Sequence, residues 1–314
     1  MIRASLDEAI ERRLNSLPPD GATIFTLGGG RVRGALLAGT RMVNAMRANH
    51  RLGALETMVL GKAYLCAGLL SATIKEGDRL ALRIDGDGPA EGFSVEAAAD
   101  GSVRGRLFRS PIETGASAAG LDEAALFGSG TLTVTRFSEG KPRPFVGTVE
   151  LKAGSIASDL ASYYLESEQT RTAFEVGLDF DREGRVVGAG ALYFQALPGA
   201  DEEFLGRVED AMPGLPGLGR RFSEGGTRAD FLERELPALF PEIVGEKEVA
   251  FSCACSRERF ASFLSSASIE LLEDLAANGP WPVETVCHNC ASAYRFEKAE
   301  LEEMLAQRRK GERG

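Results

Sequence analysis

The pattern of apolar and polar positions predicts helices and strands over the first two thirds of the chain. Apolar residues recur at helical spacing over residues 31–51, 55–74 and 155–167. In the second of these segments they cover a wide arc, which predicts a largely buried helix. Cys66 lies in this segment, and we expect it to be a small residue of the core.

Short alternating runs predict antiparallel strands joined by turns rich in Gly, Asp and Pro. These runs are residues 79–84, 93–97, 102–108, 131–136, 145–150, 174–180 and 185–196. Because strands predominate and helices are inserted between them, the pattern favours an α+β fold over a doubly wound α/β fold. We therefore predict a strand-rich amino-terminal core domain with packed helices.

The composition of the chain changes over residues 199–250. Twelve acidic residues stand there against six basic ones, a net charge of −6, and four prolines interrupt the segment. Two short amphipathic helices are predicted, at residues 201–212 and 227–240, and helices this short need tertiary contacts to persist. The predicted organisation is thus a core domain at 1–198, a docked helical linker of low intrinsic stability, and a small carboxy-terminal domain at 251–314.

Composition and charge exclude several classes of protein. Of 314 residues, 44% are hydrophobic and 26% are charged, which is typical of a globular chain. The longest uncharged stretch, residues 186–200, is too short and too broken to cross a bilayer, and residues 1–8 show no secretory signal. We therefore expect a cytoplasmic chain with no membrane partner. The net charge of −10 disfavours nucleic-acid binding, which needs a basic face.

The small number of histidines limits the chemistry that the chain can perform. Only His50 and His288 are present, and no Gly-x-Ser-x-Gly nucleophile motif occurs. His50 lies in a polar, arginine-flanked stretch, which predicts a solvated loop residue. We expect no catalytic residues and no enzyme, although hydrolysis by paired carboxylates stays open because the chain has too many acids to single any out.

Four of the five cysteines lie close together in the last fifth of the chain and predict a metal site. They form two pairs separated by residues 256–286: Cys253-Ala254-Cys255 and Cys287-His288-Asn289-Cys290. Clustered cysteines in a chain that keeps its thiols reduced indicate a metal before disulfides. A helical segment predicted at 260–277 brings the pairs together, and four soft thiolates favour Zn²⁺. His288 is an alternative ligand, but its position between two cysteines is geometrically awkward.

Three features favour a redox switch over a purely structural zinc knuckle. Zinc–sulfur bonds of about 2.3 Å hold sulfurs roughly 3.7 Å apart, whereas a disulfide needs about 2.05 Å, so oxidation must expel the metal. Arg257 and Arg259 follow the first pair and favour the thiolate that oxidants attack. Each pair is also local enough in sequence to close its own disulfide: Cys253 with Cys255, and Cys287 with Cys290.

The small size of the carboxy-terminal module makes the metal decisive for its stability. A hydrophobic core alone is marginal in a module of about 50 residues. Structural zinc contributes apparent binding energies of about 10–16 kcal/mol, whereas whole domains are stable by only about 5–15 kcal/mol. We therefore expect oxidation to unfold the module and the weakly held linker, exposing apolar surface.

Taken together, these motifs resemble the heat shock protein 33 family of redox-regulated holdase chaperones. The resemblance covers nearly the whole chain. It is carried by the two cysteine motifs, by Ser256-Arg257-Glu258-Arg259, by Tyr294 and Phe296, and by residues 31–34, 71–75, 86–89, 103–105 and 164–169. Asn289 departs from the family, where an aromatic residue is usual, and Pro280-Trp281-Pro282 looks like an insertion. Both departures leave the four cysteines intact. The sequence does not give the oxidant concentration at which the cysteines become oxidised.

The resemblance implies an ATP-independent chaperone that is inactive while it is reduced and zinc-bound. Under oxidants and heat, the two local disulfides form, zinc leaves, and the zinc module and linker unfold. The active form, commonly a homodimer, then holds unfolding client proteins until other chaperones refold them. On this resemblance, the zinc ligands and redox-active cysteines are the same residues: Cys253, Cys255, Cys287 and Cys290.

Two other functions compete with this interpretation. A zinc ribbon in a nucleic-acid-binding or translation factor would need a basic face, which the net charge of −10 disfavours. A thiol–disulfide oxidoreductase would use Cys287-x-x-Cys290 catalytically, but such pairs usually follow a strand and open a helix in a βαβ unit. Here the pair lies near the carboxyl terminus without such a unit.

Overall fold

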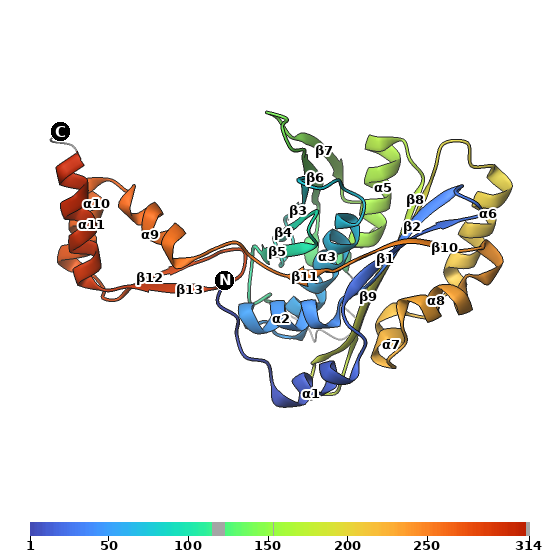
Figure 1. Ribbon diagram of the computed structural model, residues 1–314, viewed down its shortest axis with the longest axis horizontal. Helices are drawn as coiled ribbons and strands as arrows, with labels where there is room; N and C mark the ends of the chain where they lie inside the picture. Colours follow the sequence, from blue (N-terminus) through green and yellow to red (C-terminus); the bar gives the residue numbers. More distant parts are fainter. Residues whose placement is uncertain (115–122, 153, 312–314) are drawn as a thin grey trace. The chain divides into compact units, whose positions relative to one another are not determined.

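The computed structural model describes residues 1–114, 123–152 and 154–311 of the chain (Figure 1). It divides into two compact units. The larger unit is Ala4–Ser252, and the smaller unit combines Met1–Arg3 with Cys253–Gly314. Runs of antiparallel strands with helices inserted between them confirm the predicted α+β class.

Two sheets form the framework of the larger unit. One has the order β10-β1-β2-β9-β8, with bounds Glu242–Lys247, Gly21–Leu27, Val32–Ala38, Val186–Ala196 and Thr172–Phe180. The other has the order β11-β5-β4-β3-β6-β7, with bounds Ala250–Phe251, Ser102–Leu107, Gly92–Ala98, Arg79–Gly86, Gly130–Phe137 and Phe145–Glu150. Neighbouring strands are antiparallel except for the short pair of β11 with β5.

Helix α3 (Ala54–Ser71) contacts strands of both sheets and is apolar around its whole circumference because it is surrounded. Within the described residues it is the one helix long and apolar enough to span a membrane, and 78% of it is buried inside the protein. Cys66 on this helix is fully buried, and burial raises the pKa of its thiol to about 12. The prediction that Cys66 is a core residue is confirmed.

Four further helices accompany the sheets of the larger unit. They are α1 (Glu8–Ser16), α2 (Thr40–His50), α4 (Glu123–Phe127) and α5 (Ile156–Glu168). The Ser155 hydroxyl accepts a hydrogen bond from the Ser158 amide at 3.2 Å, so Ser155 caps α5. This helix packs against β7 and β8, and its bounds agree with the segment predicted at 155–167.

The prediction of one helix over residues 31–51 is wrong in its first part. Residues Val32–Ala38 form strand β2, and Gly39 separates this strand from α2. Strand β2 lies between β1 and β9 and is buried except at Arg33, so its apolar run shows no alternation to distinguish strand from helix. The loop position predicted for His50 is also wrong: it ends α2, half-buried, with its ring 6.3 Å from that of Phe251.

Residues 199–250 form three short α-helices followed by β10. The helices are α6 (Glu202–Ala211), α7 (Leu218–Ser223) and α8 (Arg228–Glu235), with single 3₁₀ turns at Met212–Gly214 and Pro237–Leu239. The helix predicted at 201–212 is confirmed. The helix predicted at 227–240 is too long, because Pro237 cannot continue it.

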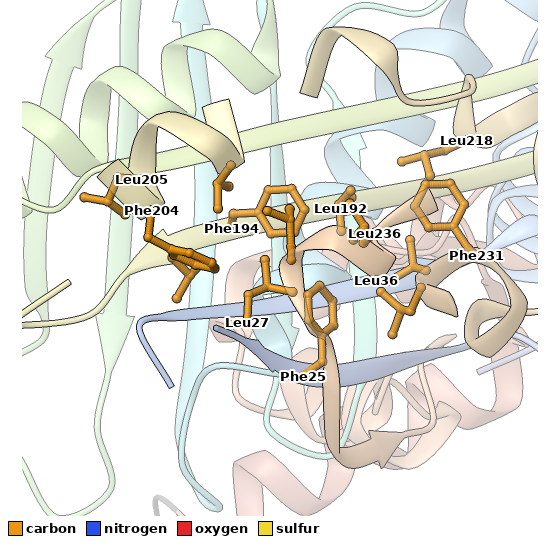
Figure 2. Close-up of a cluster of buried hydrophobic side chains, with 14 of the residues drawn as sticks. Phe25, Leu27, Leu36, Leu192, Phe194, Phe204, Leu205, Leu218, Phe231 and Leu236 are labelled. Carbon is orange, nitrogen blue, oxygen red and sulfur yellow. The ribbon is translucent and has the colours of Figure 1, made fainter. Parts of the chain in front are cut away.

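The linker helices cover one face of the five-stranded sheet (Figure 2). Phe204, Leu218 and Phe231 from the helices are buried against Phe25 and Phe194 from the strands. A Cβ at Gly28, where φ is +58°, would lie 2.4 Å from the Phe204 ring, so glycine is required there. Residues 199–250 therefore dock on the core. The predicted domain boundary at residue 198 stays a prediction.

The Arg228 guanidinium forms a network of hydrogen bonds at the edge of this interface, which we call the Arg228 clasp. Its Nε donates to Thr23 Oγ1 at 2.9 Å, its Nη1 to the Pro19 carbonyl at 3.0 Å, and its Nη2 to Glu246 Oε2 at 2.9 Å. Thr23 Oγ1 also donates to Glu246 Oε1 at 2.6 Å. The clasp joins α8 and β10 to β1 and the turn before it.

Up to residue 311, where its description ends, the smaller unit contains three helices and one hairpin. The helices are α9 (Arg257–Ser265), α10 (Ile269–Asn278) and α11 (Lys298–Gly311), and β12 (Val283–Val286) pairs antiparallel with β13 (Ala293–Phe296). The segment predicted to be helical at 260–277 consists of two helices, because the Ser268 side chain caps a new one by accepting from the Leu271 amide. In the apparent insertion, Trp281 Nε1 donates to the Leu275 carbonyl at 3.0 Å.

Replacing Phe231 by alanine tests how firmly the linker is held. The Phe231 side chain is 0% exposed, so Phe231→Ala is expected to lower the free energy of unfolding by about 3–5 kcal/mol. The matched control is Phe240→Ala, because Phe240 is in the same segment but 64% exposed, and its effect should stay within about 0.5 kcal/mol. Urea denaturation of both variants measures the difference, and equal effects would contradict a docked linker.

Candidate metal centre

The two cysteine pairs lie on different segments of the smaller unit. Cys253 and Cys255 stand in the extended segment before α9, and Cys287 and Cys290 stand in the turn between β12 and β13. That turn is tight, because the amides of Cys290 and Ala291 both donate to the Cys287 carbonyl, at 3.3 and 2.7 Å. The hairpin therefore holds its two thiols within reach of a common point.

The structure brings the four thiols together, as the spacing predicts. Their sulfur atoms all lie within 4.8 Å of one another, and the side chains are buried. Cys255 Sγ is 3.3 Å from Cys290 Sγ, and Cys253 Sγ is 3.9 Å from Cys287 Sγ. These two contacts join opposite pairs, so the segment before α9 and the hairpin interleave their thiols.

This arrangement fits a metal ion with four sulfur ligands. Tetrahedral thiolates around zinc lie roughly 3.7 Å apart, and the sulfur distances of 3.3 and 3.9 Å bracket that value. Thiolates are the ligands that soft metals prefer over Mg²⁺ or Ca²⁺. The four cysteines are therefore able to hold a metal ion and are compatible with zinc.

The sulfurs of the cluster influence the protonation of one another. Hydrogen bonding with the Cys253 sulfur is the largest influence that raises the pKa of Cys287 and of Cys290. Crowded sulfurs therefore keep their protons when no positive charge is among them. A metal ion supplies that charge and reverses the preference, because a coordinating thiol is deprotonated.

Two arginines in the first turn of α9 contact the residues around the cluster. Arg257 pairs with Glu300 at 2.7 Å, and its guanidinium lies 4.7 Å from the Phe296 ring. Arg259 Nη1 donates to the Ala254 carbonyl at 3.0 Å. Neighbouring sulfurs come first among the influences on the pKa of Cys287 and Cys290, so the expected action of these arginines on the thiols stays a prediction.

Tyr294 contacts the cluster from β13. Its hydroxyl lies 3.2 Å from Cys255 Sγ and donates to the Cys255 carbonyl at 3.2 Å. Burial raises the pKa of this phenol, so it remains a hydrogen-bond donor. The Phe260 ring packs against it at 5.2 Å. In the sequence, Tyr294 stands out only as part of the family resemblance. The spacing of the cysteines does not predict its contact with a sulfur.

The remaining candidate residues lie outside the cluster. His288 is exposed and does not belong to the group of potential ligands found among the described residues. Cys66 is in α3 of the larger unit. Cys287-x-x-Cys290 lies in a hairpin turn and not at a strand–helix junction, so it lacks the setting of an oxidoreductase motif.

Comparisons with known proteins agree with one another. The family model described as Hsp33 protein matches residues 20–297. A 33 kDa chaperonin of Desulforamulus reducens is 36% identical over 268 residues, covering 85% of this chain and 90% of that protein. One from Aquifex aeolicus is 33% identical over 290 residues, covering 90% and 89%. The crystal structure of a 33 kDa chaperonin, a heat shock protein 33 homologue of Thermotoga maritima, has a TM-score of 0.83 and 30% identity, covering 93% of this chain and 100% of that one.

These matches identify the chain as a chaperone and not an enzyme. They span both the α+β core and most of the smaller unit, which carries the cysteine cluster. The chain belongs to the Hsp33 family, as its motifs predict.

Cobalt binding tests the metal centre directly. The reduced chain is expected to bind one Co²⁺ with the visible spectrum of tetrahedral thiolate coordination, because four thiols converge on one point. Cys290→Ser should abolish that spectrum. Cys66→Ala, which removes the one cysteine outside the cluster, should leave it unchanged. A Cys290→Ser variant with an unaltered cobalt spectrum would show that the cluster is not the ligand set.

Proposed function

We propose that this chain is an ATP-independent, redox-regulated holdase of the cytoplasm that binds unfolding proteins under oxidative and heat stress. In the proposed resting state, the four clustered cysteines are reduced, bind one Zn²⁺ and keep the chaperone inactive. One observation carries the proposal. In a chain of the Hsp33 family, a buried cluster of four thiols joins the segment before α9 to the β12–β13 hairpin of the smaller unit.

The smaller unit depends on this cluster because its apolar core is small. The described core residues of that unit outside the cysteines are Leu264, Leu272, Ala276, Val283, Tyr294, Phe296, Leu301 and Leu305. A zinc ion held by the four thiolates would cross-link the segment before α9 to the hairpin, which contributes about 10–16 kcal/mol in comparable modules. A core of this size does not replace such a contribution.

Oxidation removes the ligands. Each pair of thiolates loses two electrons to a peroxide, which takes up protons and is reduced to water, and one S–S bond of about 2.05 Å forms. We propose that the redox-active disulfides are Cys253 with Cys255 and Cys287 with Cys290, because the members of each pair are close in sequence and the family resemblance implies this pairing. Sulfur contacts of 3.3 and 3.9 Å join opposite pairs, and the formation of two local disulfides removes these contacts between the segment before α9 and the hairpin. The loss of these contacts supports unfolding of the module.

Unfolding of the module reaches the linker through the chain itself. Cys253 follows Phe251 of β11 by two residues, and β11 follows β10, the last element of the linker, after two residues. Once the Arg228 clasp and the packing of α6–α8 are lost, the sheet face carrying Phe25, Leu36 and Phe194 becomes exposed. An apolar surface of this kind binds the apolar segments that unfolding proteins expose.

We further propose that the oxidised chaperone is a homodimer and has neither nucleic acid nor membrane as a partner. The family resemblance supports dimerisation. The net charge of −10 supports the exclusion of nucleic acid, because a polyanion needs a basic surface.

An aggregation assay with a heat-unfolded client tests the switch. Peroxide-treated protein is expected to suppress aggregation without ATP at about stoichiometric concentration, while reduced zinc-bound protein is not, because only oxidation exposes the apolar face. Peptide mapping of the same sample should find each disulfide within one cysteine pair. Cys66→Ala serves as the matched control and should switch normally. Equal activity of the reduced and oxidised forms would refute the proposed regulation.

A further inference from the structure

The first three residues of the chain belong to the smaller unit, although its four cysteines follow about 250 positions later in sequence. The Met1 nitrogen donates to the Cys255 carbonyl at 2.8 Å. The Ile2 amide donates to Ser292 Oγ at 3.0 Å, and Ser292 Oγ lies at the same distance from the Ile2 carbonyl, to which it donates. Residues 1–3 therefore contact both the first cysteine pair and the turn that carries the second.

Ser292 connects this amino-terminal segment to a cysteine sulfur. Its side chain is 3% exposed, and its Oγ lies 3.2 Å from Cys290 Sγ. Its carbonyl accepts a hydrogen bond from the Cys287 amide at 2.9 Å. Ser292 thus holds the Cys287–Cys290 turn through its main chain and touches the sulfur through its side chain.

In this structure the Cys290 thiol donates to Ser292 Oγ, and the Ser292 hydroxyl donates its one proton to the Ile2 carbonyl. A thiolate is the stronger acceptor because a hydrogen bond to a charged group is stronger than one to a neutral carbonyl. When Cys290 is a thiolate, the hydroxyl is therefore expected to turn toward the sulfur. The Ile2 amide still donates to the oxygen and keeps the hydroxyl in place for that contact.

We propose that residues Met1–Arg3 are a positioning segment of the metal centre and act on it through Ser292. Through Ser292 the segment orients a hydrogen bond to Cys290, and this contact holds the sulfur in the geometry that a metal ion needs. Outer-sphere hydrogen bonds of this kind typically change metal affinity by about 10–100-fold. This inference rests on the proposed zinc site.

Variants of Ile2 and Ser292 in the full chain test the proposal. Ile2→Pro removes the amide donor, whereas Ile2→Leu keeps it, and the Ile2 side chain itself is 53% exposed. Ser292→Ala removes the hydroxyl, whereas Ser292→Thr keeps it. The dissociation constant of zinc is measured on reduced protein by competition with a chromophoric chelator, after the first residue of each variant has been verified by mass.

Ile2→Pro and Ser292→Ala are each expected to weaken zinc binding by at least about tenfold, and the two conservative variants to bind close to wild type. Because the segment acts through Ser292, the double variant Ile2→Pro/Ser292→Ala should bind zinc no more weakly than Ser292→Ala alone. Zinc affinity of Ile2→Pro equal to that of Ile2→Leu overturns the proposal. So does a double variant whose two effects multiply.

A second readout does not depend on zinc. In the reduced protein, the rate at which trypsin cleaves after Arg3 should be higher for Ser292→Ala than for Ser292→Thr, because the alanine variant loses both bonds to Ile2. Equal rates would show that Ser292 does not hold the segment. If the wild-type chain binds no zinc, the proposed function fails, and the trypsin rates still decide whether Ser292 tethers residues 1–3.

Discussion

Four sulfur atoms brought within 4.8 Å of one another are the constraint on which the smaller unit depends. The cluster joins the segment before α9 to the β12–β13 hairpin, and Tyr294 and Ser292 pack around it. Such close thiols need either shared protons or a cation, since like charges in a buried site repel. In the proposed switch, disulfide formation removes the contacts between sulfurs that join the two segments.

A second interface lies in the larger unit, where α6–α8 cover a cluster of apolar side chains on one face of a sheet. These helices are short, and their stability comes from Phe204, Phe231 and the Arg228 clasp and not from helix propensity. The chain runs from β10 through β11 directly to Cys253. In the proposed switch, this continuity of the chain couples the chemistry of the sulfurs to the interface that covers the apolar cluster.

Much of this organisation is predictable from sequence, and the exceptions have physical causes. The strands with alternating patterns, such as β3 and β6, are found where they are predicted, and so is the thiol cluster, because spacing and ligand chemistry are local signals. Strand β2 is mistaken for helix because both of its faces are buried. The contact of Ile2 with Ser292 joins residues 290 positions apart, and no local pattern reports it. His50 is wrongly predicted to be a solvated loop residue, because its neighbouring arginines indicate a polar segment while its packing on Phe251 joins residues far apart in sequence.

Hydrogen exchange measured by mass spectrometry on the full chain tests the central claim most directly. The reduced, zinc-loaded protein should protect amides throughout residues 253–311, while the oxidised, metal-free protein should lose that protection there and in residues 199–250. Strands β3–β6 should stay protected in both states, which shows that the core remains folded. If residues 253–311 keep their full protection after the metal is removed and the disulfides have formed, the cluster does not hold the module together and the account is wrong.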